Sequence, residues 1–414
     1  MASGAPDRVV VINDDAAARG RSGAIALASA RLLREQGVAV DFLSGSGDVA
    51  PELEREGVAV TILGRRHLLG RSRGVAAVRG LFDPASRAAL SRWIAANDTP
   101  GTVYHLHNWH AVLSPSVFLA LRPVASRLVI SAQDFFLACP NGGYFDYPRH
   151  RECDLVPNGV RCLATACDRR PYSHKLWRVA RHRLRERLID LSESPALVVA
   201  VHEAMVPLLA RGAIAADHIR VMRNPVVPWR ATRVPAERNR DVFFVGRLDD
   251  EEGPALLARA ARRAGARLRI IGDGPVAASI ARDHPEAELL GRRSRAEIAV
   301  LIGTARMVVS PTRRREISGF VALEALTSGI PVIVSRFFAL ADEIAARGFG
   351  LVCDPYDETA LADAIAALCY DDRRVEMASC RAFSEAAALA PNPEQWCRDL
   401  LGLYASRIGE APPC

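Results

Sequence analysis

The sequence predicts an α/β fold built from two Rossmann-like, doubly wound parallel sheets that face each other across a cleft. Three observations support this prediction. Short apolar runs alternate with helical segments, the alternation breaks near residue 224 and restarts, and 414 residues are too many for one ordinary core. We expect an N-terminal domain over 1–223, a second domain over 224–393, and a C-terminal helix in 394–414 able to cross back to the first domain.

The N-terminal half begins with a βαβ unit. The apolar run 9–12 is typical of a buried parallel strand, and a polar loop with glycines follows over 13–23. A helix rich in alanine and leucine then ends at Gly37, and the run 38–43 resumes a strand. Further strands are expected at 58–63, 103–106, 128–131 and 197–201, and a helix at Asp83-Pro84.

The second half repeats the alternation. An apolar run at 241–246 precedes a helix start at Gly253-Pro254, and strands are expected at 268–271, 307–310 and 331–335. Ligands of such sheets bind beyond the carboxyl ends of the strands. The functional site is therefore expected between the two halves of the chain.

Composition excludes several classes of function. The net charge of +7 is carried by arginine, because Lys175 is the only lysine, and no nucleic-acid motif accompanies it. We therefore expect no nucleic acid partner. The N-terminus lacks the features of a signal peptide and no run of about 18 apolar residues occurs, which predicts a cytoplasmic location.

The sharpest pattern lies in the second half, where Glu316 and Glu324 flank Ser318-Gly319-Phe320. Ser318 is the expected N-cap of a helix over 320–327, whose free N–H groups and positive end suit a diphosphate. Glu324 lies about one and a half turns into that helix, where it can accept ribose hydroxyls, and Glu316 precedes the helix, where it can reach sugar hydroxyls. A single glutamate is more often a solvated residue, so the surrounding pattern decides.

That pattern resembles the glutamate-seven-glutamate motif of family-four glycosyltransferases, which have the two-Rossmann GT-B fold. Further matches occur in order at 221–226, 245–248, 271–275, 290–292 and 329–333. The resemblance implies transfer of a sugar from a nucleotide-diphosphate sugar to an acceptor hydroxyl, with retention of configuration and without a metal cofactor. It also implies a saccharide or lipid-linked acceptor, in the synthesis of cell-surface polysaccharide or glycolipid.

The resemblance assigns donor-site residues. The base and ribose would lie against Gly272, Asp273, Gly274 and Glu324, with Arg247 on the diphosphate.

One departure stands out, because Glu252 occupies the place of a lysine that the family puts before Gly253. We favour the interpretation that Glu252 turns away and that Arg314 or Arg315 supplies the charge. The alternative is loss of activity.

The first half offers two histidines. His105 and His107 share one face in the run Tyr104–His110, where relatives have a histidine-containing loop, and we prefer His107 as the residue that reaches the ligand. A packed histidine is an equal alternative. Near Asp134, Gln133 stands where many relatives have a histidine.

A glycine-bearing segment in the first half also resembles the family. The run Arg19–Gly23, with Gly20 and Gly23, is similar to the loop whose backbone approaches the donor diphosphate. A simple strand-to-helix turn would show the same pattern.

Two further features remain open. Cys139, Cys153, Cys162 and Cys167 are either a structural zinc site or buried free thiols. The segment 169–187 is typical of a basic amphipathic helix, which either rests on the anionic inner face of the membrane or packs on the first lobe.

Two other functions compete with the transferase. A catalytically silent GT-B protein would bind a nucleotide sugar or a polysaccharide-assembly partner without turnover. A nicotinamide-dependent oxidoreductase would need G-x-G-x-x-G after the first strand, and the sequence lacks it there.

Overall fold

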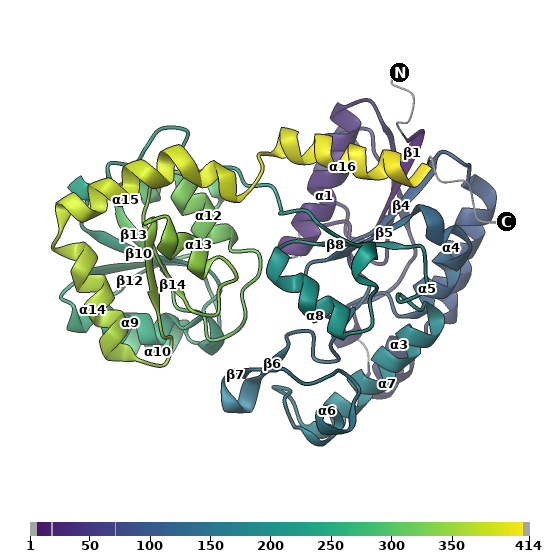
Figure 1. The fold of residues 1–414 in the computed structure, drawn as a ribbon, viewed down its shortest axis with the longest axis horizontal. Helices are drawn as coiled ribbons and strands as arrows, with labels where there is room; N and C mark the ends of the chain where they lie inside the picture. The colour runs from purple at the N-terminus through teal and green to yellow at the C-terminus, as the bar shows by residue number, and fades with distance from the viewer. Residues whose placement is uncertain (1–5, 18–19, 71, 409–414) are drawn as a thin grey trace. The chain divides into compact units, whose positions relative to one another are not determined.

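The structure is a computed structural model that describes residues 6–17, 20–70 and 72–408, and it divides into two compact units. The first unit joins the described residues up to Asn224 with those from Pro393 onward, and the second is Pro225–Asn392 (Figure 1). Each unit contains a parallel sheet between helices, which confirms the predicted α/β class with two doubly wound sheets.

Seven described strands of the first unit form one parallel sheet in the order β3-β2-β1-β4-β5-β8-β9. Their central members are almost fully buried, as expected for a parallel sheet covered on both faces. The order reverses between β1 and β4, so ligands are expected beyond the ends of these two strands. The strands are β1 (Arg8–Asn13), β2 (Ala39–Ser44), β3 (Ala59–Ile62), β4 (Thr102–Leu106), β5 (Leu128–Ala132), β8 (Leu197–Ala200) and β9 (Ile219–Val221).

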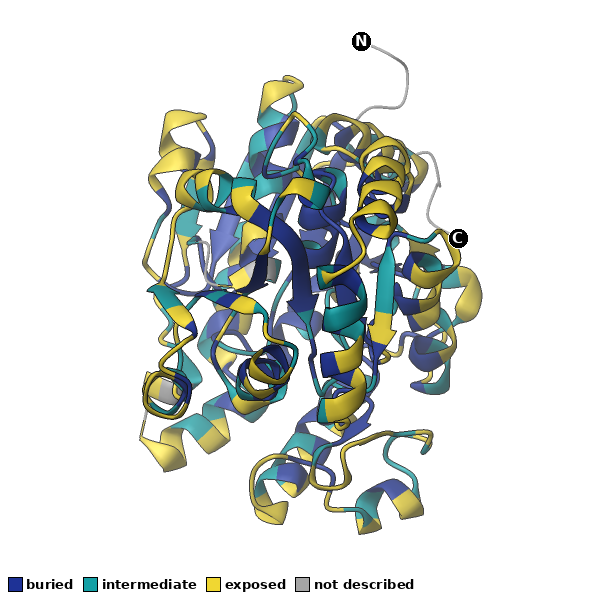
Figure 2. Cartoon of the chain, turned by 90° about the vertical axis from the view of Figure 1, so that its left-hand side faces the viewer, coloured by how far each residue is buried: buried dark blue, intermediate teal, exposed yellow. Residues whose placement is uncertain are grey.

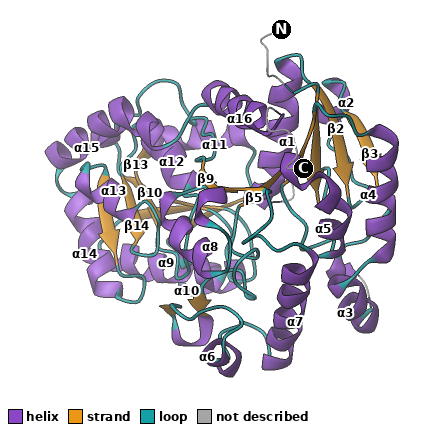
Figure 3. Cartoon of the chain, turned by 45° about the vertical axis from the view of Figure 1, so that its right-hand side comes forward, coloured by secondary structure: helices purple, strands orange, loops and turns teal. Residues whose placement is uncertain are grey.

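Helices cover both faces of this sheet (Figure 3). At α4 the Asp83 carboxylate accepts the Ala85 N–H at 3.1 Å and Pro84 opens the helix. The glycine-bearing loop is shorter than expected, because α1 already begins at Gly20. The helices are α1 (Gly20–Glu35), α2 (Pro51–Arg55), α3 (Arg73–Leu81), α4 (Pro84–Asn97), α5 (Ser116–Leu121), α6 (Val160–Ala164), α7 (Tyr172–Leu188), α8 (Val206–Arg211) and α16 (Pro393–Ile408).

The last helix, α16, packs on the first sheet beside α1 (Figure 1). Its Tyr404 hydroxyl lies 2.6 Å from Nδ1 of His105 on β4. Its Arg407 guanidinium donates to the carbonyl oxygens of Ser126 and Pro195, both at 2.6 Å. The end of the chain therefore completes the core of the first unit.

The second unit contains a six-stranded parallel sheet in the order β12-β11-β10-β13-β14-β15 among its described residues. Its central strands are buried between helices whose outer faces are exposed (Figure 2). The strands are β10 (Asp241–Val245), β11 (Arg267–Ile271), β12 (Glu288–Gly291), β13 (Ala305–Ser310), β14 (Val332–Ser335) and β15 (Gly350–Cys353). The helices are α9 (Pro254–Arg263), α10 (Ala277–Asp283), α11 (Arg295–Leu301), α12 (Phe320–Thr327), α13 (Ala341–Ala346), α14 (Glu358–Cys369) and α15 (Asp372–Glu385).

An irregular segment, 133–171, separates β5 from α7. Its regular structure consists of the antiparallel pair β6 (Phe145–Asp146) and β7 (Arg151–Glu152), one 3-10 turn and the short α6. None of the described helices has both the length and the apolar character needed to cross a bilayer.

Candidate functional site

Two loops meet at the switch point of the second sheet, where the strand order reverses between β10 and β13. The backbone N–H of Arg313 donates to the carbonyl oxygen of Glu251 at 2.7 Å, and the Thr312 hydroxyl donates to the same oxygen at 3.1 Å. Gly253 has a φ of +75°, and a Cβ there would lie 2.5 Å from the carbonyl oxygen of Pro311. These contacts hold both loops together where doubly wound sheets bind ligands.

Glu316 is fixed at this point through both its backbone and its side chain. Its N–H donates to the carbonyl oxygen of Phe337 at 3.0 Å, and its own carbonyl oxygen accepts from Ala339 at 2.8 Å. Its Oε1 accepts the backbone N–H groups of Ser318 (3.1 Å) and Gly319 (3.0 Å). The carboxylate is therefore oriented before any ligand arrives.

The start of α12 differs from the prediction. Gly319 is the N-cap, with a φ of +56°, and no side chain caps the first turn. Ser318 is not the cap, because its backbone N–H serves Glu316 instead. The first turn of α12, which begins at Phe320, places its backbone N–H groups and the positive end of the helix dipole at this point.

Glu324 lies on α12, with 17% of its side chain exposed, and forms an ion pair with Arg295 of α11. Arg295 also donates to the carbonyl oxygens of Val227 and Pro228, the latter at 3.1 Å. The carboxylate expected to accept ribose hydroxyls thus already has a cationic neighbour. The sequence contains no signal for this partner, which lies 29 positions away.

Glu252 does not turn away from the site, which corrects the interpretation favoured from the sequence. The Arg314 guanidinium forms an ion pair with the Glu252 carboxylate, and its Nε donates to Oε1 at 3.1 Å. Arg314 Nη2 also lies 3.7 Å from Oε2 of Glu316. The expected arginine is present, and two carboxylates hold it in place.

The glycines of the loop after β11 have a structural explanation. A Cβ on Gly272, whose φ is +147°, would lie 1.8 Å from the carbonyl oxygen of Gly246. A Cβ on Gly274 would lie 2.4 Å from that of Leu248. The loops after β10 and β11 therefore pack backbone against backbone, and the glycines need no ligand contact to account for them.

Two further residues assigned to the donor are exposed on these loops. The Asp273 carboxylate accepts the N–H of Gly274 at 2.8 Å. Arg247 has 79% of its side chain exposed and lies 3.2 Å from the Asp249 carboxylate. Both side chains remain accessible from solvent.

His105 is enclosed in the core of the first unit, as the packed alternative predicts. The residue is 1% exposed, and its Nδ1 and Nε2 lie 2.6 Å from the Tyr404 hydroxyl and 2.9 Å from that of Ser131. Burial holds the pKa of the imidazole well below its usual value. Both nitrogens are occupied within the fold.

His107, the residue preferred for contact with a ligand, is also buried, with 2% of the residue exposed. Its Nε2 lies 3.3 Å from the Ser29 hydroxyl, and among the described groups its Nδ1 has no hydrogen-bond partner. Burial lowers the pKa to about 3, so the imidazole is neutral at pH 7.

A third histidine, His110, is the one with access to solvent. Its side chain is 26% exposed, its Nε2 lies 3.9 Å from the Asp134 carboxylate, and its ring packs on Phe136. His110 stands farthest beyond the strand end in the same run, and that position was the signal available in the sequence. Gln133 beside Asp134 pairs with the Asn224 amide at 3.0 Å and 2.8 Å.

Sequence reasoning missed Asp14, which joins the loops after β1 and β4 at the switch point of the first sheet. Its carboxylate accepts the backbone N–H groups of Ala111, Val112 and Leu113 at 2.8, 3.0 and 2.7 Å. The buried Arg181 donates to the His110 carbonyl oxygen at 2.9 Å in the same region. Asp14 is thus a structural centre of this loop pair.

The glycines assigned to the first donor loop lie in α1 itself. Gly20 is its first residue, with a φ of +77°, and a Cβ there would meet no other atom within 4 Å, whereas Gly23 is buried within the helix. Arg19, in the same motif, lies outside the described residues. Of these two glycines, Gly20 is exposed and Gly23 is buried.

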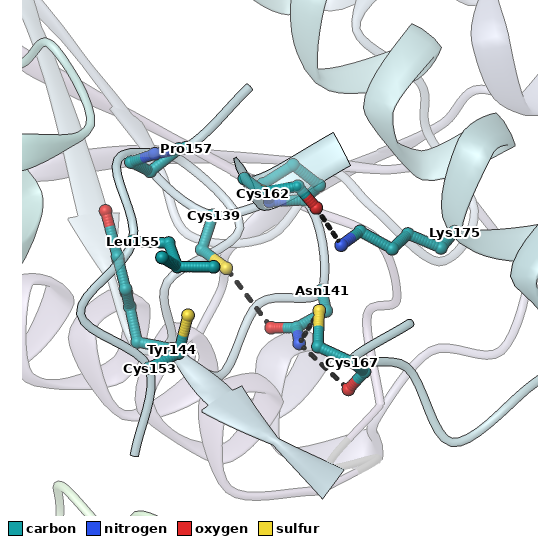
Figure 4. A pocket seen from close by; sticks show the side chains of 10 residues that line it. Cys139, Asn141, Tyr144, Cys153, Leu155, Pro157, Cys162, Cys167 and Lys175 are labelled. Atoms are coloured by element: carbon teal, nitrogen blue, oxygen red, sulfur yellow. Dashed lines mark hydrogen bonds between the residues drawn. The ribbon is translucent and has the colours of Figure 1, made fainter. Parts of the chain in front are cut away.

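The four cysteines of the irregular segment line one small cavity (Figure 4). Burial raises the pKa of the Cys139 thiol to about 12. Among the described residues, no three His, Cys, Asp or Glu side chains are yet spaced to hold a metal ion. The structure therefore brings the four thiols together without a closed ligand set.

The basic helix α7 packs inward. Lys175, Arg181 and Arg185 are 1%, 7% and 1% exposed, so these basic side chains cannot lie on a membrane surface, contrary to the first of the two interpretations of this segment. Arg185 donates to the carbonyl oxygen of Leu137. Burial lowers the pKa of Arg185 to about 10, so the guanidinium stays charged at pH 7.

In the comparison with known proteins, the family-model match lies within the second unit. Residues 228–389 match the family model of glycosyl transferases group 1. The chain is 34% identical over 172 residues to a D-inositol 3-phosphate glycosyltransferase of Corynebacterium glutamicum, covering 36% of this chain and 41% of that protein. It is 28% identical over 253 residues to a glycogen synthase of Mycobacterium tuberculosis, covering 57% and 59%. The matched region thus spans about two fifths to three fifths of these relatives.

Solved structures resemble nearly the whole chain. Anabaena Alr3699/HepE in complex with UDP has a TM-score of 0.66 at 15% identity, covering 96% of this chain and 100% of that one. Sucrose-phosphate synthase from Thermosynechococcus elongatus has a TM-score of 0.69 at 16% identity, covering 97% and 98%. Residues 228–389 thus match the kind of family model that the sequence resemblance predicts, and the chain has the predicted two-Rossmann GT-B fold, shared with these solved structures.

Proposed function

We propose that the chain transfers a sugar from a nucleoside-diphosphate sugar to an acceptor hydroxyl. The observation that carries this proposal is the convergence of Glu316, Arg314 and the first turn of α12 at the switch point of the second sheet. Structures similar to this chain include one solved with UDP and one solved with UDP-glucose, which supports the same donor class here.

Sugar transfer requires positive charge near the bond between the sugar and the diphosphate of the donor, because that bond breaks. Cleavage of the bond between the sugar and the diphosphate leaves negative charge on the departing nucleotide, and fixed donors stabilise that charge most when it is fully developed. The N–H groups of α12 and the guanidinium of Arg314 are such donors. Glu324 then accepts ribose hydroxyls, and Oε2 of Glu316 accepts a hydroxyl of the sugar.

We further propose that transfer is retaining and independent of a metal. Metal independence is supported by two carboxylates near the strand ends, Asp14 and Asp249, which already have partners within the fold. Asp14 accepts three backbone N–H groups. Asp249 accepts the N–H of Glu252 and pairs with Arg247.

The direct test is a thermal-shift titration with UDP, GDP and ADP, followed by incubation with the matching nucleotide sugars and saccharide acceptors. A ligand that binds only the folded state stabilises that state by about 2.7 kcal/mol at a concentration of 100 times its Kd. This stabilisation raises the melting temperature. Absence of any shift with all three nucleotides would contradict the proposal.

Glu252 makes a sharper prediction within this site. Glu252→Gln should raise the affinity for a nucleoside diphosphate about tenfold, because it removes a carboxylate that repels the ligand while an amide can still accept from Arg314. Isothermal titration measures this change. Glu237→Gln, which removes a carboxylate paired with Arg233 in the same unit, should leave the affinity unchanged. A weaker Glu252→Gln complex would mean that the carboxylate is needed to position Arg314.

A silent protein that binds the donor or a polysaccharide-assembly partner without turnover is the second candidate function. Gln133 stands where many relatives have a histidine. Its side-chain amide is hydrogen-bonded to the side-chain amide of Asn224, and neither amide can act as a general base. Binding of a nucleotide sugar without transfer or hydrolysis would favour this candidate over the transferase.

We propose a saccharide or lipid-linked acceptor, with contact to the anionic cytoplasmic face of the membrane. The surface that supports this is not the basic face of α7. The support comes from α6 and the start of α7, where Val160 is 84%, Leu176 46% and Tyr172 41% exposed. The arginines at 161, 169, 170 and 183, in the same stretch of sequence, are also exposed. Apolar residues beside arginines are typical of an interfacial surface.

This surface predicts binding to vesicles of phosphatidylglycerol. The double variant Val160→Glu/Leu176→Glu should bind about tenfold more weakly in co-sedimentation, because it replaces apolar contact by like charge against the lipid. Val300→Glu, at a valine that is 74% exposed on α11, is the matched control. Equal binding of wild type and double variant, or equal binding to phosphatidylcholine, would refute the contact.

A further inference from the structure

Four thiols from one irregular segment surround a single cavity of about 10 Å³ (Figure 4). Such a space holds one water-sized occupant and no organic ligand. We propose that Cys139, Cys153, Cys162 and Cys167 bind one zinc ion there as thiolates. This structural site is independent of the donor site in the second unit.

The donor set fits zinc, because four cysteine sulfurs at about 2.3 Å make up a common tetrahedral structural site. The sequence spacing is irregular and allowed no decision between zinc and free thiols. The new observation is spatial: all four cysteines line one cavity, although up to 28 positions separate them.

Closing the ligand set requires the sulfurs to turn toward the cavity, since the described side chains are not yet spaced to hold an ion. A cysteine sulfur is moved by rotation about one bond, between staggered positions that need no backbone shift. The hydrogen bond lost in this change is the one from the Cys139 thiol to Oδ1 of Asn141, at 3.1 Å, because a zinc-bound thiolate has no proton to donate.

Lys175 supplies an independent argument. The side chain lines the same cavity, the residue is 1% exposed, and its ammonium donates to the carbonyl oxygens of Cys162 and Thr165. In the described part of the chain, no carboxylate forms an ion pair with it. A buried cation is stable only near compensating charge, and zinc with four thiolates carries a net charge of −2.

Asn141 fits the same site as an outer partner. An amide N–H that donates to a ligand sulfur orients it and reduces its charge, as partners of metal ligands commonly do. Nδ2 of Asn141 already donates to Cys167 and to the carbonyl oxygen of Phe145, at 2.9 Å for the latter. The amide N–H₂ group can keep both of these acceptors when the sulfurs turn inward.

The backbone conformation of segment 133–171 is a further argument for a crosslink. Tyr144, His150 and Asn158 have φ values of 46°, 51° and 58°, in the left-handed region that non-glycine residues rarely adopt. Such conformations persist where their surroundings over-determine them. With little regular structure between β5 and α7, a four-point metal link would provide that constraint.

The test is metal analysis of the full chain, purified without a metal-affinity step and without chelators. We expect about one zinc ion per chain, and loss of nearly all of it in Cys153→Ser/Cys162→Ser. Cys380→Ser, at an exposed cysteine of α15, should keep the metal. Cobalt substitution of the wild type should give the intense visible absorption of a tetrahedral thiolate site.

Because a cysteine variant can fail to fold, the wild type supplies a second readout. A strong chelator should speed proteolysis within 133–171, zinc should reverse the effect, and nucleoside diphosphate binding by the second unit should remain. Lys175→Met should release zinc to the chelator about tenfold faster, since it removes the neutralising charge.

Three results would overturn the proposal. They are a chain without zinc that takes none up against a competing chelator, a mass lower by four hydrogens that reveals two disulfides, and full zinc content in the double cysteine variant. Zinc release from Lys175→Met at the wild-type rate would refute the role of the buried ammonium.

Discussion

Arg314→Met should lower kcat/KM for the nucleotide sugar by about 100-fold to 1,000-fold, the usual effect of removing one fixed donor from a developing anion. Arg314 is the cation that reaches from the loop after β13 to the carboxylates of Glu252 and Glu316. No other guanidinium pairs with both of these carboxylates among the described residues. Steady-state kinetics with varied donor and saturating acceptor measures the loss.

The neighbouring arginine provides the control for this prediction. Arg313 lies with its guanidinium carbon 5.6 Å from the centre of the Tyr356 ring and donates to the carbonyl oxygen of Pro355 at 3.4 Å. Its contact with the loop after β10 is made by its backbone, which Arg313→Met keeps. A change of less than about threefold is expected for it. Equal losses in the two variants would mean that general basicity, and not the position of Arg314, supports the donor.

Arg314→Lys separates charge from geometry. Lysine retains the positive charge but loses the planar fork that contacts Glu252 through two nitrogens. We expect a partial recovery of kcat/KM, with most of the remaining defect in kcat. The same assay measures both constants.

The sequence predicted the sheets well in their centres and less well at their edges. Buried central strands such as β1, β10 and β13 are continuous apolar runs, because helices cover both of their faces. The parallel strands that we did not predict, β9, β12 and β15, are all edge strands. Their side chains are partly exposed, so their sequences lack that signal.

The candidate site could be predicted only where topology determines it. Glu316 follows a central strand at a switch point, and that position is readable from the chain. The pairing of Arg314 with Glu252 beside Glu316 could not be predicted from the sequence, because these two residues are 62 positions apart. His105 shows the same limit: the hydroxyl of Tyr404, 299 positions away, helps to enclose it.

The prediction of Ser318 as the N-cap of α12 was wrong for a local reason. Serine is a common N-cap, but here Gly319 adopts the left-handed conformation that the turn requires, and a Cβ there would lie 2.9 Å from Leu340. The tertiary contact decides between two neighbouring cap residues of similar preference. Helix bounds were still predicted, because the apolar pattern begins at Phe320 in either case.

Asp14→Asn should lower the free energy of unfolding of the first unit by about 3–5 kcal/mol, which corresponds to roughly 10 °C in its melting temperature. The Asp14 carboxylate is 4% exposed and accepts three backbone N–H groups. An asparagine would turn its own N–H₂ toward at least one of these donors. The substitution would also remove the negative charge that favours the charged form of the buried Arg181.

Calorimetry of the full chain checks this loss, with Glu35→Gln as the control. Glu35 forms an exposed pair with Arg31 within α1, so its removal should shift the melting temperature by no more than about 2 °C. Nucleoside diphosphate affinity should be the same in both variants, because that ligand belongs to the second unit. A wild-type melting temperature for Asp14→Asn would show that the three N–H groups find other acceptors. The loops after β1 and β4 would then be held by the apolar core and not by this carboxylate.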